Sequence, residues 1–189
     1  MKDLWRRLQR YSDYPDPAAA AANTVAVVVA LNGPFYPVYV VLMIGVAGAA
    51  SVVTMIASPI FFAVPWIARR SSAAGRAALA LVGILNTIWC VKLFGPASEV
   101  QLFCVPCIML AALLYRGWER IVALPLIGLA ILALAAPDSL YGVPLIAFSP
   151  EQARALTRLH MISAATLTGL IALQFMRLLP DTSRSSTPD

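Results

Sequence analysis

The spacing of charged residues is the feature that most constrains the fold of this chain. No charged side chain occurs between Asp16 and Arg69. One membrane-spanning helix needs about 20 apolar residues, so this stretch is long enough for two. The later uncharged stretches are 77–91, 100–115, 121–137 and 159–176. Each reaches spanning length when flanking basic side chains extend to the membrane interface. The charge gaps therefore predict six transmembrane helices.

The composition agrees with a membrane environment. Hydrophobic residues make up 60% of the chain, charged residues only 12%, and the mean hydropathy is +0.80. Soluble domains average about 45–50% apolar and about 25% charged residues. These values exclude a soluble globular domain, a disordered chain and a coiled coil. The net charge is +5, but the basic residues are scattered rather than clustered, which argues against nucleic-acid binding.

The fold class predicted is an all-α integral membrane bundle with both termini cytoplasmic. Its domain divisions are a cytoplasmic segment 1–19, a six-helix membrane domain 20–179 and a disordered cytoplasmic tail 180–189. The expected helices are 20–43, 49–68, 73–93, 99–115, 120–136 and 157–178. Eleven of the 14 basic residues then share one side with the termini. The positive-inside rule makes that side cytoplasmic, as in a multi-pass protein of a bacterial inner membrane.

The N-terminal segment allows two interpretations. Trp5 and Leu8 lie on one side of a helix over these residues, with Arg6 and Arg10 on the other. The segment is therefore either an amphipathic helix on the inner leaflet or a solvated tail.

Prolines within the predicted helices mark kinks, because proline removes a backbone hydrogen bond. Pro34 and Pro37 place a kink near the middle of helix 20–43, where Asn32 can bond a freed carbonyl. Pro106 receives the same structural role in helix 99–115.

A polar stripe lies on helix 73–93. Gly83, Asn86, Thr87 and Cys90 are spaced i, i+3, i+4 and i+7, which places them on one helical face, with Trp89 beside it. Small and polar residues on such a face either join helices together or form the polar wall of a binding cavity. The spacing alone leaves both interpretations open.

Cys104 and Cys107 form a Cys-x-x-Cys pair, the spacing of a redox dithiol or of two metal thiolates. Only Cys90 and the single histidine, His160, remain as further ligands or relay groups. Structural cysteines are therefore favoured, with redox or metal chemistry and ligand contact as alternatives. No metal or cofactor is expected.

Other polar residues lie near the expected outer end of the bundle. Gln101 opens helix 99–115, and His160 and Ser163 lie on the last helix. His160 is either an interfacial capping residue or a ligand contact. Together with the stripe, these give the candidate ligand-binding set: Asn86, Thr87, Trp89, Cys90, Gln101, Cys104, His160 and Ser163.

The loop 137–156 is apolar in its middle, so we expect it to lie on the membrane or to enter the mouth of the bundle. Ser149, Pro150 and Gln152 have the pattern of a helix start, with Ser149 as the cap. The last helix should therefore begin near Pro150.

Reactive groups typical of enzymes are scarce in the sequence. It contains no Ser/His/Asp set, no phosphate-binding loop and no paired carboxylates within a span. This argues against acid–base catalysis and against an ion-coupled pump. No catalytic residue is assigned, and an enzyme is the less favoured interpretation.

Three segments resemble the six-helix membrane sensor modules that precede bacterial adenylate cyclases and some histidine kinases. They are the short basic N-terminal segment, the stretch Asn32 to Tyr36, and the stretch Leu93 to Phe103. The run Phe103 to Cys107 is similar to the receptor part of quorum-sensing kinases. The resemblance implies a receptor-like module. The polar stripe and the absence of catalytic and transport residues lead us to expect that it binds a small hydrophobic or lipid-like ligand. Those families carry an effector domain and this sequence shows none, so signalling would need a separate cytoplasmic or membrane partner, or a homodimer.

The expected partners are thus the lipid bilayer, a hydrophobic ligand and a signalling protein, with no nucleic acid. Two alternatives remain. The chain is a non-catalytic accessory subunit of a larger membrane complex, or it is a membrane thiol protein that uses Cys104 and Cys107.

Overall fold

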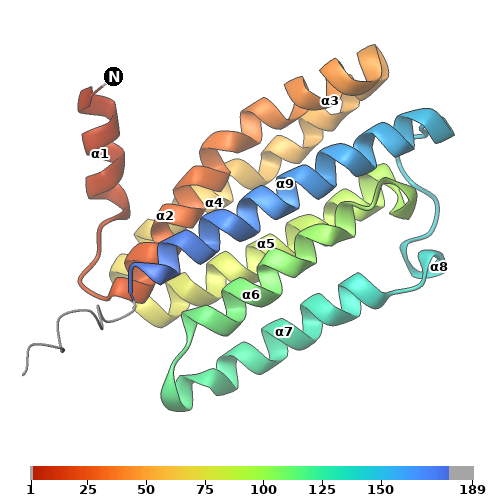
Figure 1. Ribbon diagram of the computed structural model, residues 1–189. Coiled ribbons are helices and arrows are strands. Elements are labelled where there is room, and N and C mark those ends of the chain that lie inside the picture. The colour runs from red at the N-terminus through yellow and green to blue at the C-terminus, as the bar shows by residue number, and fades with distance from the viewer. Residues whose placement is uncertain (1, 179–189) are drawn as a thin grey trace, which may run out of the picture.

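The computed structural model describes residues 2–178, and throughout that range the chain forms helices and no strand (Figure 1). The α-helices are α1 (Lys2–Ser12), α2 (Pro17–Asn32), α3 (Tyr36–Ile44), α4 (Ala57–Arg70), α5 (Ser72–Phe94), α6 (Cys104–Leu114), α7 (Arg120–Ala135), α8 (Asp138–Tyr141) and α9 (Pro150–Met176). The 3₁₀ helices are η1 (Gly33–Phe35), η2 (Gly45–Ile56), η3 (Pro96–Ser98), η4 (Val100–Phe103) and η5 (Gly117–Glu119). The predicted tail 180–189 lies outside the described residues.

Four helical stretches are long and apolar enough to cross a membrane: Pro17–Arg70, Ser72–Phe94, Gly117–Ala135 and Pro150–Met176. A fifth apolar stretch, Val100–Leu114, is shorter. Large apolar side chains also point away from the bundle. On α7, for example, Ile121 and Leu132 are 69% and 70% exposed. Large exposed apolar side chains of this number are rare in soluble proteins, so the helices are compatible with an integral membrane protein.

The 54-residue stretch Pro17–Arg70 doubles back on itself. Helices α2 and α3 run out along the bundle, and η2 and α4 return beside them (Figure 1). The reversal occurs at Gly45, whose φ of 75° favours glycine. Gly48 then packs against α3 so closely that an added Cβ would lie 2.8 Å from Cγ1 of Val40. Glycine at both positions allows the tight return.

Side-chain caps define where several helices begin. The Asp16 carboxylate accepts a hydrogen bond from the Ala18 N–H at the start of α2, and Pro17 occupies the first turn. Ser149 and Gln152 form a reciprocal capping box at the start of α9. The prediction that the last helix begins near Pro150 is confirmed.

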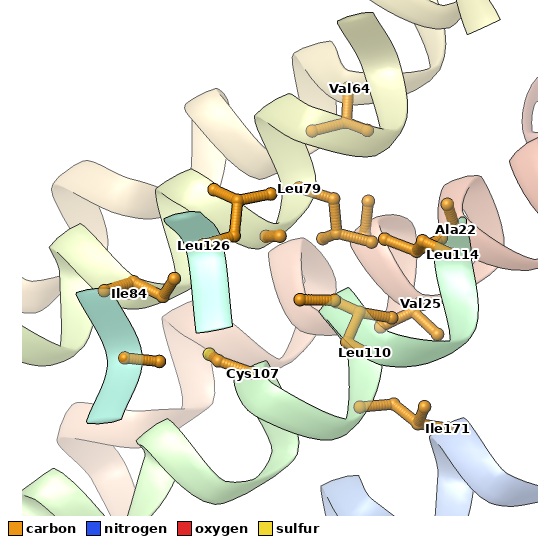
Figure 2. Close-up of a cluster of buried hydrophobic side chains, with 14 of the residues drawn as sticks. Ala22, Val25, Val64, Leu79, Ile84, Cys107, Leu110, Leu114, Leu126 and Ile171 are labelled. Atoms are coloured by element: carbon orange, nitrogen blue, oxygen red, sulfur yellow. The ribbon is translucent and has the colours of Figure 1, made fainter. Parts of the chain in front are cut away.

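The main hydrophobic core lies where α2, α4, α5, α6, α7 and α9 meet (Figure 2). The buried face of α2 consists largely of alanines, including Ala22, Ala26 and Ala30. Larger side chains such as Leu79 of α5 and Leu114 of α6 fill the space that these small residues leave. Small residues at helix contacts let the backbones approach closely, which is how helices pack tightly in lipid.

The loop between α8 and α9 packs across one end of the bundle. The Lys92 ammonium donates to the carbonyls of Tyr141 and Val143 at 3.1 and 2.8 Å. The N–H groups of Leu145 and Ile146 donate to the carbonyls of Lys92 and Leu93. Ile146 and Phe148 also pack on a second apolar cluster, formed by Cys90, Val91, Leu93, Phe94 and Val100. The apolar loop is therefore held against the end of α5.

Candidate ligand cavity

A partly open cavity of about 140 Å³ lies between α2, α4, α5, α6 and α9. Most of its wall is apolar, with Val25 of α2, Phe61 of α4, Leu110 of α6 and Ile171 of α9 among the lining residues. A cavity of this size is large enough to hold a benzene-sized molecule. The cavity is therefore a candidate site for a small, mainly apolar ligand.

The polar stripe of α5 forms one wall of this cavity. Gly83, Asn86, Thr87 and Cys90 all line it. The Thr87 hydroxyl donates to the Gly83 carbonyl at 2.9 Å, so its hydrogen is already used. Oδ1 of Asn86 is buried and accepts no hydrogen bond within the described residues. A buried acceptor without a partner is costly, and a ligand that carries a donor would satisfy it.

The wall opposite α5 depends on a close approach of η1 to α4. A Cβ added to Gly33 would lie 1.9 Å from Oγ of Ser58 and 3.2 Å from its Cβ, so a larger residue would require the Ser58 side chain to move. Asn32, Gly33 and Ser58 all line the cavity. The helix axis changes here from α2 through η1 to α3, with Pro34 in η1 and Pro37 at the start of α3. Of the predicted kink residues in this stretch, Asn32 lines the cavity, whereas Pro34 and Pro37 do not.

The remaining kink residue, Pro106, lines the cavity from the first turn of α6. Cys107, which follows it, also lines the cavity. An added Cβ on Gly83 would lie 3.0 Å from Sγ of Cys107, so these two residues face each other across α5 and α6.

The candidate residues from the sequence divide into two groups. Asn86, Thr87 and Cys90 meet at the cavity. The others, Trp89, Gln101, Cys104, His160 and Ser163, do not line it. Trp89 is 37% exposed on the outer surface of α5, and Gln101 bonds to the Pro96 carbonyl and the Glu99 carboxylate at 3.4 and 3.3 Å.

His160 is fully buried beside the cavity rather than in it. Its Nδ1 lies 2.6 Å from the carbonyl oxygen of Ser98, and its Nε2 lies 2.6 Å from the Tyr36 hydroxyl. A carbonyl only accepts, so Nδ1 carries the hydrogen. In a neutral imidazole Nε2 then accepts from Tyr36. The rings of Tyr36, Phe94 and Phe103 surround the imidazole at centroid distances of 6.0–6.2 Å.

Tyr36 belongs to both sites, because it lines the cavity and also donates to His160. It connects His160, which does not line the cavity, to the cavity wall. Sequence reasoning identified His160 but missed Tyr36, since nothing in the local pattern pairs two residues 124 positions apart.

The three cysteines are buried free thiols. Cys104 is 1% exposed and Cys107 is 7% exposed. No group of three or more metal-binding side chains occurs among residues 2–178. The arrangement therefore offers an external reagent little access to Cys104 or Cys107.

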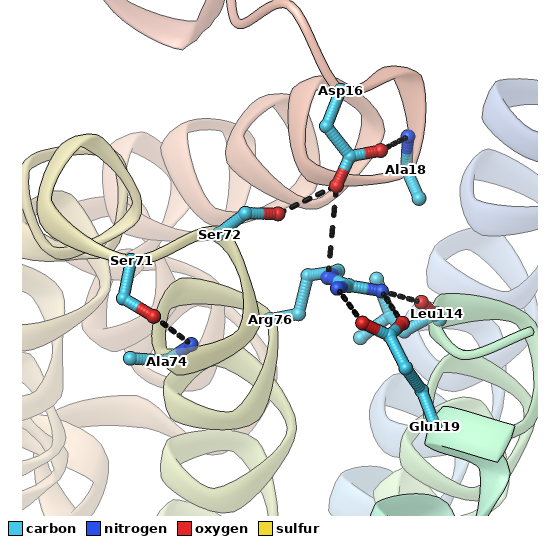
Figure 3. A network of polar contacts seen from close by, with 8 residues as sticks. All are labelled: Asp16, Ala18, Ser71, Ser72, Ala74, Arg76, Leu114 and Glu119. Carbon is cyan, nitrogen blue, oxygen red and sulfur yellow. Dashed lines mark hydrogen bonds and ion pairs between the residues drawn. The ribbon is translucent and has the colours of Figure 1, made fainter.

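A buried ion-pair network at the opposite end of the bundle was not anticipated from the sequence (Figure 3). The Arg76 guanidinium of α5 is 6% exposed. It donates to both oxygens of Glu119 at 2.8 and 3.0 Å and to the Leu114 carbonyl at 2.7 Å. Its Nε also lies 3.8 Å from a carboxylate oxygen of Asp16. The network joins the start of α2, the first turns of α5 and the connection between α6 and α7.

Asp16 has several stabilising contacts within this network. Its carboxylate accepts hydrogen bonds from the Ser72 hydroxyl at 2.5 Å and from the Ala18 N–H at 3.0 Å. Partial burial alone would raise the pKa of Asp16. The hydrogen bonds from Ser72 and Ala18 and the charge of Arg76 outweigh it and lower the pKa below 3.8. The carboxylate is therefore held in its charged form.

Comparisons with known proteins identify no relative. No family model, no curated protein and no solved structure matches this chain.

Proposed function

We propose that the protein is a six-helix sensor or receptor-like module of a bacterial inner membrane. It binds a small hydrophobic or lipid-like molecule in the cavity and signals through a separate protein. The single observation that carries this proposal is the cavity itself: an apolar space between the helices of the bundle, with the buried, unpartnered Oδ1 of Asn86 in its wall. A small number of polar atoms in an apolar cavity is typical of ligand sites.

The six crossings are part of the proposal. A straight helix of 54 residues would be about 80 Å long, against about 30 Å for the hydrocarbon core of a bilayer. The return at Gly45 supports two crossings by Pro17–Arg70. Helix α5 supplies the third crossing, Val100–Leu114 the fourth, and α7 and α9 the fifth and sixth. Both termini then lie on one side, and the basic residues concentrated there favour the cytoplasm.

The path from ligand to partner would run through Tyr36 and His160. A ligand that fills the cavity would contact Tyr36, which lines it, and the Tyr36 hydroxyl is hydrogen-bonded to His160 of α9. Displacement of Tyr36 would therefore shift α9, whose end lies beside the start of α2 (Figure 1). A shift of this kind at a helix end is a common form of switching.

The accessory-subunit alternative requires no internal cavity, and the thiol alternative requires accessible cysteines. The cavity and the burial of Cys104 and Cys107 favour ligand binding over both. Purification of the native protein followed by a measurement of its size tests the first alternative, because an accessory subunit would purify as part of a larger complex. Replacement of both cysteines by serine separates the second, because it would abolish only a thiol-based function.

The ligand can be sought by thermal unfolding in the presence of a lipid-soluble extract. The purified protein in lipid nanodiscs should unfold at a higher temperature with the extract than without it, because binding stabilises the folded state. The substitution Val29→Phe places a larger side chain in the cavity wall and should remove this shift. Leu85→Phe, on the exposed side of α5, should retain it.

Two results would contradict the proposal. One is no shift with any fraction of the extract. The other is an equal shift for the wild-type chain and the Val29→Phe variant.

A further inference from the structure

A second hollow, of about 810 Å³, lies outside the core between α1, α2 and α9. We call it the α1 groove. It shares no lining residue with the ligand cavity, and its walls differ in character: one side is apolar and the other is rich in arginine.

The apolar wall follows one face of α2. Ala20, Thr24, Val27 and Leu31 line the groove at successive helical turns. From Ala20 to Leu31 this face extends about 16 Å along the helix. The hydrocarbon layer of one membrane leaflet is about 15 Å thick, half of the whole core. The wall is therefore long enough to lie along one acyl chain of a lipid.

The arginine-rich wall comes from α1 and from the end of α9. Arg6, Arg10 and Arg177 line the groove, and Asp13 is the acidic residue among its lining. Arg6 forms an exposed ion pair with Asp3 at 2.9 Å. Arg10 and Arg177 form no ion pair within residues 2–178. The wall thus carries an excess of positive charge.

Several contacts hold α1 in position beside α2. The Tyr11 ring stacks on Phe62 of α4 at 4.9 Å, and its hydroxyl donates to the Phe62 carbonyl at 2.7 Å. The amide of Asn23, which is buried in α2, donates to the Ser12 carbonyl at 3.2 Å. The last turn of α1 is therefore anchored, and the arginines before it face a groove of defined shape.

We propose that the α1 groove binds an anionic phospholipid. The acyl chain lies along the α2 wall, and the phosphate contacts Arg10 and Arg177. Guanidinium groups bind phosphate through charge-assisted hydrogen bonds, and basic residues beside a membrane attract anionic lipids. The groove shares no lining residue with the ligand cavity, so this proposal does not rest on the sensor function.

Trp5 lines the groove and can report its occupant. We suggest a variant that keeps Trp5 as the sole tryptophan, with Trp66, Trp89 and Trp118 changed to Phe, reconstituted in bilayers of equal phosphatidylglycerol and phosphatidylcholine. Bromine on the acyl chains of one lipid quenches nearby tryptophan. Two samples are compared, one with brominated phosphatidylglycerol and one with brominated phosphatidylcholine. Because they differ only in which lipid carries bromine, the ratio of Trp5 quenching in the first sample to that in the second measures the lipid preference beside Trp5.

Brominated phosphatidylglycerol should be enriched beside Trp5 by at least about five-fold, the factor that each arginine at an anionic surface contributes. Equal quenching by the two lipids would overturn the proposal. Arg10→Gln and Arg177→Gln should each reduce the enrichment. Arg7→Gln, on the same helix but outside the groove, is the matched control and should change it little.

Arg177 distinguishes a lipid site from an α1 helix that merely lies on a charged membrane. Arg177 belongs to the end of α9, so its replacement alters the groove without altering α1. Enrichment that is unchanged in Arg177→Gln would contradict the groove. The other candidate occupant is the chain's own segment 179–189. Enrichment that appears only after truncation at residue 178 would assign the groove to that segment instead.

Discussion

The Tyr36 hydroxyl lies 2.6 Å from Nε2 of His160, although 124 positions separate the two residues in the sequence. This bond joins α3, which begins at the edge of the cavity, to the middle of α9. Since the other imidazole nitrogen is bonded to Ser98, both nitrogens of the buried ring have partners. The histidine is therefore fixed in one orientation.

Tyr36→Phe should destabilise the protein by about 1–3 kcal/mol, because it leaves Nε2 of a fully buried imidazole without a donor. Thermal unfolding in detergent micelles measures the change. Tyr39→Phe is the matched control, since Tyr39 is 39% exposed. Equal stability of the Tyr36 and Tyr39 variants would mean that the bond to His160 contributes nothing.

Glu119→Gln should cost about 2 kcal/mol. This value lies between the small contribution of exposed ion pairs and the larger cost of breaking buried ones, because the Arg76 and Glu119 side chains are 7% and 30% exposed. Glu151→Gln, at an exposed position, should change stability by less. A double replacement of Arg76 and Glu119 by apolar residues should cost less than the sum of the two single replacements. Additive effects would show that the two side chains do not interact.

Asp16 should make stability depend on pH in the acidic range. Its pKa in the folded protein is below 3.8, so the contribution of the carboxylate is fully present above that value. It is lost as the pH falls through the lower, folded pKa. Asp16→Asn should therefore reduce stability at neutral pH and flatten this part of the profile. Asp138→Asn, an exposed carboxylate, is the control. An unchanged acid profile in Asp16→Asn would contradict the role of Ser72 and Arg76 in holding the charge.

Gly33→Ala should destabilise the bundle by about 1–3 kcal/mol, the usual cost of forcing extra atoms into a packed core. The added Cβ would lie 1.9 Å from Oγ of Ser58 and 3.2 Å from its Cβ. Ser58→Ala removes the nearer atom, so the double variant should recover much of the loss. Gly128→Ala, where nothing lies within 4 Å of the added atom, should be close to neutral. A Gly33→Ala variant that is as stable as the wild type would show that the α2–α4 crossing is looser than described here.

The sequence predicted the helical class and the start of α9 because both depend on local signals. Charge spacing reports where apolar helices lie, and Ser149, Pro150 and Gln152 act within one helical turn. The stripe Asn86, Thr87 and Cys90 was also identified correctly as one face, because it follows from helical periodicity. The sequence did not decide whether that face joins helices or lines a cavity. That choice depends on how far α2, α4 and α6 stand from α5.

The remaining features depend on contacts between distant parts of the chain. The Arg76–Glu119 pair spans 43 positions, and each residue alone resembles an ordinary interface charge. The sequence also did not predict that Gly45–Ile56 forms the 3₁₀ helix η2, because the composition of this segment is that of an α-helical span. This segment packs along α3, a contact that periodicity does not reveal.

The most direct test of the account is the binding of benzyl alcohol and ethylbenzene to the purified protein, followed by thermal unfolding. The two probes are similar in size, but only the alcohol can donate to Oδ1 of Asn86. The account predicts that both stabilise the wild-type chain and that the alcohol binds about five-fold more tightly, as one hydrogen bond of about 1 kcal/mol requires. Asn86→Leu should abolish this preference, and Leu85→Phe should retain it. If neither probe stabilises the protein, or if Asn86→Leu leaves the preference unchanged, the cavity is not the ligand site proposed here.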